Sequence, residues 1–463
     1  MALDPETIEQ LVREARASSF GDPRLRDRLA NIIEKVATLP KQSFPKIFNS
    51  AELEGAYRFF SNPKVDSDEI LSGHYASVAD SSRAAESVLV VHDSSTFVFD
   101  PEGERVGLGR VRKGDQAFFG HFSLALKADG SRHPLGMAAL ETWIRNDDPA
   151  APNEKERWAR CVDVSSSRLS GARLLHVMDR GADDYALFAH LVQRQHRFLI
   201  RLSYDRVLEK ELGGTVKHLS DVLNQVECLV ERTTELSKRK DGARSPTQKK
   251  IHPSRPGRVA RLAIGATRIE LPRPSNRAKT SLPERLELNL IRVWELDPPE
   301  GAAPVEWLLL TNESVESVED LNRLVDAYRA RWTIEEFFKA LKTGCSYLKR
   351  QLEDYEALVN ALAMSIPIAC KALLSRTISR EQPDSEQTIL DADHLLILRE
   401  KGRTKLPLKP TNRDILLAVA ALGGHIKWNG EPGWQTICKG FETLLPMTEG
   451  FRIARKLLLA SDQ

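Results

Sequence analysis

The sequence predicts an α/β fold with a mainly β insertion, flanked by helical segments at both ends of the chain. Strand patterns between about 88 and 143 are followed by alternating helix and strand patterns, and extended segments occupy about 206–310. Before and after this region, apolar residues recur at helical spacing. The chain has 463 residues, 41% of them hydrophobic, which is enough for several cores. We therefore expect domains at 1–66, 67–369 and 370–463.

The N-terminal region is predicted to form short helices. In GDPRLRDRLANIIEKVATL, Asp22 is placed to cap a helix and Pro23 stands at its first position. Arg24, Arg26 and Arg28 follow in the first turns, where cations oppose the helix dipole. A bound phosphate would relieve this conflict. Solvated surface arginines are the alternative that the sequence leaves open.

The middle region begins with strands that lead to carboxylates. Val88 to Val91 form a short buried-strand pattern, and Asp93 follows at its end. Two further strands are expected on either side of a turn near Asp129. The next segment predicts a strand that ends near Asp179, then a helix, then a strand at 198–202. Three strands followed by alternating helix and strand is an order that fits ribonuclease-H-like folds.

Charge is unevenly distributed along the chain. Sixty-seven Lys and Arg against sixty-five Asp and Glu leave a net charge of +2, yet residues 231–280 hold fourteen basic and only four acidic residues. This local excess, centred on SKRKDGARSPTQKKIHPSRPGRVAR, favours a polyanionic partner, with nucleic acid as the first candidate. A solubilising surface loop is the alternative.

The cysteines and the apolar runs indicate the compartment. Five cysteines are scattered without CxxC pairs in a chain too large to need disulfides, so we expect reduced thiols and a cytoplasmic protein. We expect no membrane span, because no apolar run approaches the roughly eighteen residues required. The acidic start, MALDPETIEQ, also predicts no export signal.

The stretch YRARWTIEEFFKALK, at 328–342, concentrates aromatic, basic and acidic residues. If it forms one helix, at about 100° per residue, the side chains of four polar residues fall within an arc of roughly 60°. These are Tyr328, Arg331, Glu335 and Lys342. Apolar residues occupy the adjoining arc, so this helix would pack on a sheet with its polar row beside the contact. Taken alone, the helix is better explained by a surface ion pair between Arg331 and Glu335, worth about 0.3 kcal/mol, than by a functional site.

A carboxylate on this helix would complete a set with the two strand aspartates. Phosphoryl transfer on nucleic acid commonly uses two divalent ions held by acidic side chains, and Mg²⁺ prefers such oxygen ligands. Asp93, Asp179 and Glu335 are the candidates for this set. Arg331 and Lys342 would then contact flanking phosphates.

These motifs resemble those of DDE transposases of the IS-four family. The spacing from Tyr328 through Arg331 and Glu335 to Lys342 matches the signature of that family. Other matching motifs extend over nearly the whole chain: GDPR at 21–24, EGAYRF at 54–59, DRGAD at 179–183 and WLLLT at 307–311. The resemblance implies a ribonuclease-H-like catalytic domain between an end-binding domain and a C-terminal dimerisation domain.

The resemblance also implies a role for each of these residues. Asp93, Asp179 and Glu335 correspond to the catalytic triad, which would hold two Mg²⁺ ions, with Mn²⁺ as a substitute. Trp307 corresponds to an aromatic residue on which a flipped base stacks, although a core tryptophan opening a strand is the alternative. The other implied DNA contacts are Tyr328, Arg331, Lys342, Arg201, Arg28 and Arg58.

The family mechanism would be cut-and-paste transposition of double-stranded DNA. Water frees a 3′ hydroxyl at the transposon end, that hydroxyl forms a hairpin with the opposite strand, water reopens it, and the 3′ ends join target DNA. The resemblance implies a homodimer on paired ends and a bacterial, nucleoid-associated protein. Departures at Thr38, Gln351 and Ala357 leave the recognised end sequence open. A structure-specific nuclease and a catalytically silent DNA-binding derivative are the alternatives.

Overall fold

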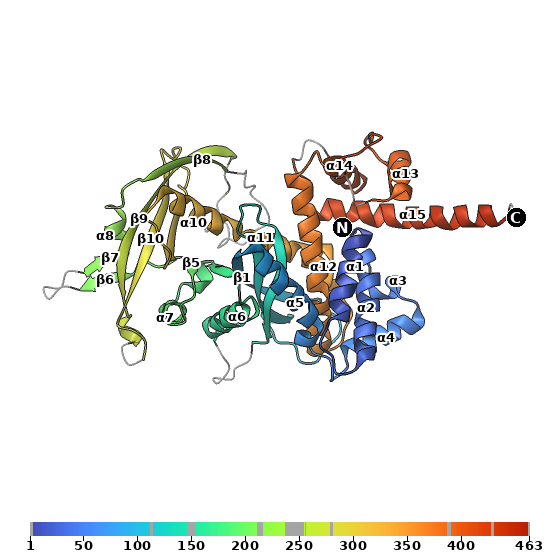
Figure 1. The fold of residues 1–463 in the computed structure, drawn as a ribbon, viewed down its shortest axis with the longest axis horizontal. Helices are drawn as coiled ribbons and strands as arrows, with labels where there is room; N and C mark the ends of the chain where they lie inside the picture. The colour runs from blue at the N-terminus through green and yellow to red at the C-terminus, as the bar shows by residue number, and fades with distance from the viewer. Residues whose placement is uncertain are drawn as a thin grey trace. The chain divides into compact units, whose positions relative to one another are not determined.

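The computed structural model describes residues 3–111, 114–145, 153–210, 216–236, 254, 256–277, 281–386, 390–426 and 430–461. Most of the basic stretch at 237–261 lies outside these residues. The chain forms two compact units (Figure 1). Unit 1 comprises Met1–Ala151, Asp163–Arg173 and Trp332–Gln463, and unit 2 comprises Pro152–Val162 and Leu174–Arg331. The three domains expected at 1–66, 67–369 and 370–463 stay a prediction.

Unit 1 begins with five helices. These are α1 (Pro5–Arg16), α2 (Pro23–Thr38), α3 (Phe44–Ile47), α4 (Ser50–Phe60) and α5 (Ser67–Ala85). Helix α2 starts as predicted, because the Asp22 carboxylate accepts a hydrogen bond from the Arg24 amide at 3.0 Å and Pro23 needs no such acceptor. Its apolar stripe, from Leu29 to Val36, is buried.

The sheet of unit 1 contains three antiparallel strands in the order β3-β2-β1. They are β1 (Ser87–Phe99), β2 (Gln116–Lys127) and β3 (Pro134–Trp143). Asp93 was expected at the end of a short strand, and this prediction is wrong. Strand β1 continues to Phe99, so Asp93 lies near its middle, opposite Phe122 of β2. The hydrophobic run ends at Val91, but pairing with β2 carries the strand through the polar residues that follow.

Helix α12 (Tyr355–Glu381) is the central helix of unit 1, and most of its side chains are buried. It packs against α5, α4 and β3, and against the C-terminal helix α14. By length and composition α12 is apolar enough to cross a membrane, but 89% of its apolar window is buried inside the structure, as in the core helix of a globular unit. It also runs unbroken through the boundary expected at residues 369 and 370.

The remaining helices of unit 1 lie at the C-terminal end. They are α13 (Ala392–Lys401), α14 (Asn412–Leu422) and α15 (Trp434–Ser461). Helix α14 ends at the adjacent glycines Gly423 and Gly424, and Gly424 has a positive φ of 92° that favours glycine. Four of the five cysteine thiols, those of Cys161, Cys345, Cys370 and Cys438, are buried, and that of Cys228 is exposed.

Unit 2 contains a mixed sheet in the order β4-β5-β11-β10-β9-β8, in which β4 and β5 are parallel and the other neighbours antiparallel. Its elements confirm the predicted strand, helix and strand around Asp179 and the mainly β character of 206–310. They are β4 (Arg173–Met178), α7 (Tyr185–Gln193), β5 (Phe198–Arg201), β6 (Val207–Lys210), β7 (Val216–His218), α8 (Leu219–Leu223), β8 (Val230–Leu236), β9 (Arg258–Pro272), β10 (Arg285–Leu296), β11 (Glu306–Thr311) and α10 (Val318–Ala330). Helix α6 (Glu154–Arg168) is divided between the units at Val162. Trp158, Tyr185 and Phe198 are among the large side chains in the core of unit 2.

The stretch at 328–342 was predicted as one continuous helix, and this prediction is wrong. Helix α10 ends at Ala330, α11 spans Thr333–Lys339, and a π-helical turn occupies Ala340–Gly344. Between α10 and α11 the backbone tightens, because the Arg331 amide bonds to the Tyr328 carbonyl and the Glu335 amide to the Trp332 carbonyl, both at 3.1 Å. The angular arc calculated for a straight helix therefore does not describe these four polar residues.

Arg350 is a buried cation that connects the segment after the π-helical turn to the loop after α2. Its guanidinium donates hydrogen bonds to the carbonyls of Gln42 at 2.7 Å, Pro40 at 2.9 Å and Cys345 at 3.0 Å. It also lies 4.4 Å from the centre of the Phe44 ring. Burial lowers the pKa of Arg350 to about 10, with neighbouring Cys345 and Tyr347 opposing this shift. The three carbonyls thus compensate for removing the cation from water.

Replacing Arg350 with Met keeps an unbranched side chain but removes the guanidinium, which leaves three carbonyls without their donor. We expect the free energy of unfolding to fall by about 2–4 kcal/mol, measured by urea denaturation. Lys349→Met, at the exposed neighbouring position, should change it by less than about 0.5 kcal/mol. Equal stability of the two variants would contradict the structural role of Arg350.

Candidate active site

In unit 1, helix α11 is held against the sheet by aromatic packing at the position of Asp93. The ring of Phe122, which lies opposite Asp93 in the strand pair, is 5.2 Å from the ring of Phe338 and 5.8 Å from that of Phe337. These contacts place Glu335, on the same helix, beside the part of β1 that carries Asp93. Both carboxylates are half-buried, so unit 1 brings two of the three predicted acidic residues onto adjoining elements.

Lys342 joins the same region through the π-helical turn. Its ammonium donates to the hydroxyl of Ser95 and to the carbonyl of Thr96, each at 2.8 Å, on the strand that carries Asp93. Burial lowers the pKa of Lys342, and the Glu335 carboxylate only partly offsets this shift. Lys342 therefore places a partly desolvated positive charge next to the candidate carboxylates.

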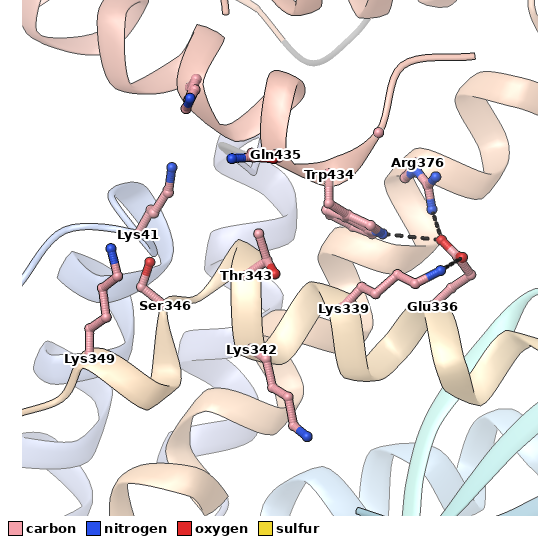
Figure 2. A pocket seen from close by; sticks show the side chains of 12 residues that line it. Lys41, Glu336, Lys339, Lys342, Thr343, Ser346, Lys349, Arg376, Trp434 and Gln435 are labelled. Carbon is pink, nitrogen blue, oxygen red and sulfur yellow. Dashed lines mark hydrogen bonds and ion pairs between the residues drawn. The ribbon is translucent and has the colours of Figure 1, made fainter. Parts of the chain in front are cut away.

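Glu336, the neighbour of Glu335, faces other helices of unit 1. It accepts hydrogen bonds from Lys339 at 2.6 Å, from the indole of Trp434 on α15 at 3.2 Å, and from Arg376 on α12 (Figure 2). Partial burial raises the pKa of Glu336, but the bonds from Lys339 and Arg376 outweigh it and hold this pKa at about 2. Glu336 thus connects α11 to α12 and α15 as a fully ionised carboxylate at neutral pH.

Asp179 lies in unit 2, directly after β4 as predicted. It caps a single 3-10 turn, Arg180–Ala182, and its carboxylate accepts a hydrogen bond from the Gly181 amide at 2.7 Å. A Cβ added at Gly181 would lie 2.8 Å from an oxygen of that carboxylate, so a larger residue here would displace the Asp179 side chain. The turn thereby holds Asp179 in one orientation with the carboxylate half-buried.

Arg201, Trp307 and Tyr328 form a second cluster in unit 2. The Trp307 ring meets the Tyr328 ring edge to face, with centroids 5.3 Å apart, and the Arg201 guanidinium lies 5.7 Å from the Trp307 ring centre. Arg201 also donates to the Glu306 carbonyl at 3.0 Å. Trp307 is half-buried in β11 and therefore keeps part of its ring at the surface. Three residues predicted from sequence to contact DNA are thus side by side.

The titration of this cluster reflects its burial. Burial raises the pKa of Tyr328, against the opposing effect of Arg201 and Arg331, so the phenol is protonated at neutral pH. Burial likewise lowers the pKa of Arg201, although a guanidinium remains charged at neutral pH. The cluster offers a phenol, an indole and cationic guanidinium groups, all suited to phosphates and bases.

Arg28 and Arg58 lie on α2 and α4, two helices that pack together in unit 1. Both are exposed. Arg58 forms an ion pair with Glu54 one turn earlier, and the Arg28 guanidinium lies over Gly55, where an added Cβ would come within 2.3 Å of it. The two arginines are therefore available on adjoining helices, with only weakly held surface partners.

The sequence reading missed the contacts of Glu336 with Arg376 and Trp434. These partners are 40 and 98 positions away along the chain, so no local spacing reveals them. The local sequence offers one signal, which is the pair of adjacent acidic residues Glu335 and Glu336. Glu335 belongs to the predicted row of polar residues, so Glu336 lies outside that row and needs a separate partner.

The pKa of Glu336 leads to a pH-dependent prediction. Because the folded value is about 2 and the ordinary value 4.5, the ionised carboxylate stabilises the fold above pH 4.5, and this stabilisation is lost as pH falls towards 2. Glu336→Gln should lower the melting temperature at pH 7, and the difference from the parent should shrink below pH 4.5. Glu34→Gln, at an exposed position of α2, should show no such difference. A Glu336→Gln deficit that is constant from pH 7 to pH 3 would disprove the assignment.

Comparison with known protein families gives two matches. A transposase DNA-binding family matches residues 10–65, which include Arg28 and Arg58. The transposase DDE domain family matches residues 137–369, half of the chain, and this span includes Asp179 and Glu335 but begins after Asp93.

A solved structure with some similarity is the cryo-EM structure of a piggyBac transposase synaptic complex with hairpin DNA. The identity is 11% and the TM-score 0.31; the match covers 81% of this chain and 65% of that chain. At this level of similarity it adds nothing to the assignment, which rests on the two family matches. The chain belongs to the family of proteins with a transposase DDE domain, preceded here by a transposase DNA-binding segment.

Proposed function

We propose that this protein is a cut-and-paste DNA transposase of the IS-four family, close to the Tn-five type, with a ribonuclease-H-like catalytic domain. It would bind transposon ends, cleave them through a DNA hairpin, and join the 3′ ends to target DNA. The observation that supports the proposal is the docking of α11, the helix that carries Glu335, on β1 and β2, where β1 carries Asp93, within a DDE-family chain. The motifs shared with the IS-four family support the finer assignment.

We assign Asp93, Asp179 and Glu335 as the metal-binding carboxylates. The DDE domain family implies the use of divalent metal ions, and these oxygen donors suit Mg²⁺, with Mn²⁺ as a substitute. Asp93 and Glu335 fit this role because they are half-buried on adjoining elements, and Asp179 because Gly181 orients it. Two such ions would activate the attacking oxygen and stabilise the leaving oxygen. The chain's own contribution is to fix the directions of the three carboxylates.

We assign the neighbouring cations and aromatic residues to the DNA. Lys342, already desolvated beside β1, would act as a point charge on a phosphate, and Arg331 would offer a bidentate contact. In the cluster of unit 2, Tyr328 would donate its phenolic proton to a phosphate oxygen. Trp307 would stack on a flipped base, and the Arg201 guanidinium and the Tyr328 ring would keep their contacts with the Trp307 ring. A stacked base contributes about 1–3 kcal/mol to binding.

We assign the recognition of transposon ends to the N-terminal helices. The DNA-binding family match at 10–65 covers α2 and α4, whose exposed Arg28 and Arg58 carry the positive charge. Phosphate groups of the DNA would pair with the arginines in the first turns of α2. The helix dipole also favours anions at this end of the helix. Backbone contacts of this kind position the protein, and base contacts select the sequence.

We infer a homodimer on paired DNA ends in the bacterial cytoplasm, associated with the nucleoid. The last turns of α15 support this inference, because Ile453, Leu457 and Leu459 are exposed apolar residues on one long helix. Such a helix suits a second copy of the chain as partner. No membrane partner is proposed, since α12 is a buried core helix.

Replacing Glu335 with Ala should abolish cleavage of DNA that carries the element's terminal repeats, with at least a 10³-fold loss of rate. End binding, measured by gel shift, should persist, because the DNA-binding segment is untouched. Glu353→Ala, at an exposed position of the same unit, serves as the control and should cleave normally. Cleavage by Glu335→Ala at the parental rate would exclude the triad.

The same assay separates the alternatives. Strand joining in Mg²⁺ supports the transposase, cutting without joining indicates a structure-specific nuclease, and binding alone indicates a silent derivative. The magnitude expected for Glu335→Ala follows from removing a group that acts on the reacting centre.

Trp307→Ala should impair hairpin formation more than the first nick, since base flipping is needed only when the opposite strand is attacked. Single-turnover rates of the two steps, resolved on denaturing gels, measure this ratio. Trp294→Ala is the matched control, because Trp294 is also a half-buried strand residue with an arginine, Arg292, 4.9 Å from its ring centre. An equal slowing of both steps by Trp307→Ala would remove the base-flipping role.

A further inference from the structure

Unit 1 contains a pocket of about 670 Å³ whose lining is strongly basic. Its walls come from four regions of the chain: the loop after α2, the segment from α11 to residue 349, helix α12, and the start of α15 with the residue before it. The basic residues of this lining are Lys41, Lys339, Lys342, Lys349, Arg376 and Lys439. Glu336 is the acidic residue among those that line it.

The cations of the pocket fall into two groups according to their partners. Lys339 and Arg376 share the single carboxylate of Glu336, and Lys41 forms an ion pair with Glu442 of α15 at 2.8 Å. Among the described residues, Lys349 and Lys439 have no carboxylate within ion-pair distance. Lys342 donates its hydrogen bonds to two neutral oxygens of β1 and is partly offset by the Glu335 carboxylate. The pocket therefore retains an excess of positive charge after its internal ion pairs are formed.

The directions of the side chains strengthen this view. Figure 2 shows Lys41 and Lys349 extending towards the same side of the pocket, next to the Ser346 hydroxyl, whereas Lys342 points the other way towards the sheet. Because the Lys41 ammonium is already paired with Glu442, Lys349 is the uncompensated cation of this pair. The hydroxyls of Ser346 and Thr343 supply neutral donors at the same place.

We propose that this pocket binds the phosphate backbone of a DNA strand, with Lys349 and Lys439 as its principal contacts. The proposal rests on the proposed function, and it adds a DNA contact that includes the C-terminal helix. A phosphodiester chain fits better than a single anion, because the unpaired cations come from separate walls of a 670 Å³ space. Strand binding here would connect the loop after α2, the segment after Glu335 and α15 through one ligand.

The role of Glu336 follows from the same arrangement. An uncompensated carboxylate in this lining would repel phosphate, but Glu336 is covered by Lys339, Arg376 and the indole of Trp434. Trp434 is buried, so it forms part of the wall and leaves no ring face for a base. The charged lining therefore suits the phosphate backbone, whose contacts position a protein on DNA.

The test compares the parent with Lys349→Gln/Lys439→Gln and with a charge-matched control, Lys405→Gln/Lys409→Gln, at exposed positions between α13 and α14. Affinity for a duplex carrying a terminal repeat is measured from 50 to 300 mM KCl. Each lost phosphate contact lowers the slope of log K against log salt by about 1, so the pocket variant should lose about 2 and bind about 10-fold more weakly. Its melting temperature should match the parent, because neither lysine holds an internal ion pair.

If the pocket variant shows the same slope and affinity as the control, the pocket proposal is wrong. The proposed function would still hold in that case, provided that Glu335→Ala loses cleavage as expected. Inorganic pyrophosphate tests whether the pocket binds a small phosphate compound instead of DNA. If it raises the melting temperature of the parent but not of the pocket variant, while DNA affinity is unchanged, the pocket holds a small phosphate and the DNA proposal is wrong. Failure of the parent itself to bind or cleave DNA would instead refute the proposed function.

Discussion

The two-sided anchoring of α11 is the constraint on which the candidate active site depends. On one side, Phe337 and Phe338 pack on Phe122, and both rings are nearly or fully buried. Fully burying a phenylalanine contributes about 1.5–3 kcal/mol, and each aromatic pair adds about 0.5–1.5 kcal/mol. On the other side, Glu336 binds Arg376 and Trp434. At about 100° per residue these contacts lie on opposite faces, so the helix cannot turn about its axis.

This anchoring explains why Glu335 and Lys342 reach the sheet from one short segment. Glu335 projects from the flank of α11, between its aromatic face and its ionic face. Lys342 lies in the π-helical turn, where an extra residue shifts the side chains that follow relative to an α-helix. Its bonds to Ser95 and Thr96 then attach the end of the segment to the strand that also carries Asp93. The Glu335 carboxylate and the Lys342 ammonium are thus both positioned relative to β1.

Features encoded over a few neighbouring residues could be predicted from the sequence. Asp22 and Pro23 define the start of α2, and the run of apolar residues before Asp179 defines β4. Arg201 ends β5 and Trp307 opens β11 where the patterns place them. In each case the determining interaction is a cap, a strand alternation or a turn, all of which are local.

Features that depend on distant partners could not be predicted. Asp93 was predicted at a strand end because the apolar run stops at Val91, but β1 continues through polar residues that pair with β2. The stretch at 328–342 was predicted as one straight helix, because no sequence pattern near Lys342 indicates its hydrogen bonds to residues almost 250 positions earlier. The Glu336 contacts were missed for the same reason. A family resemblance supplies the identity of a site, but not these tertiary contacts.

Arg350 has a consequence for exchanging parts between related proteins. Its guanidinium is bound by the carbonyls of Pro40 and Gln42, which are main-chain groups within the DNA-binding family segment. Main-chain acceptors do not depend on side-chain identity, so a foreign DNA-binding segment of different sequence can satisfy Arg350 if its loop has the same length and path. In a chimera whose loop differs by even one residue, the buried Arg350 guanidinium would lose its hydrogen-bond acceptors. Such a chimera would fail to fold, so its DNA specificity could not be measured.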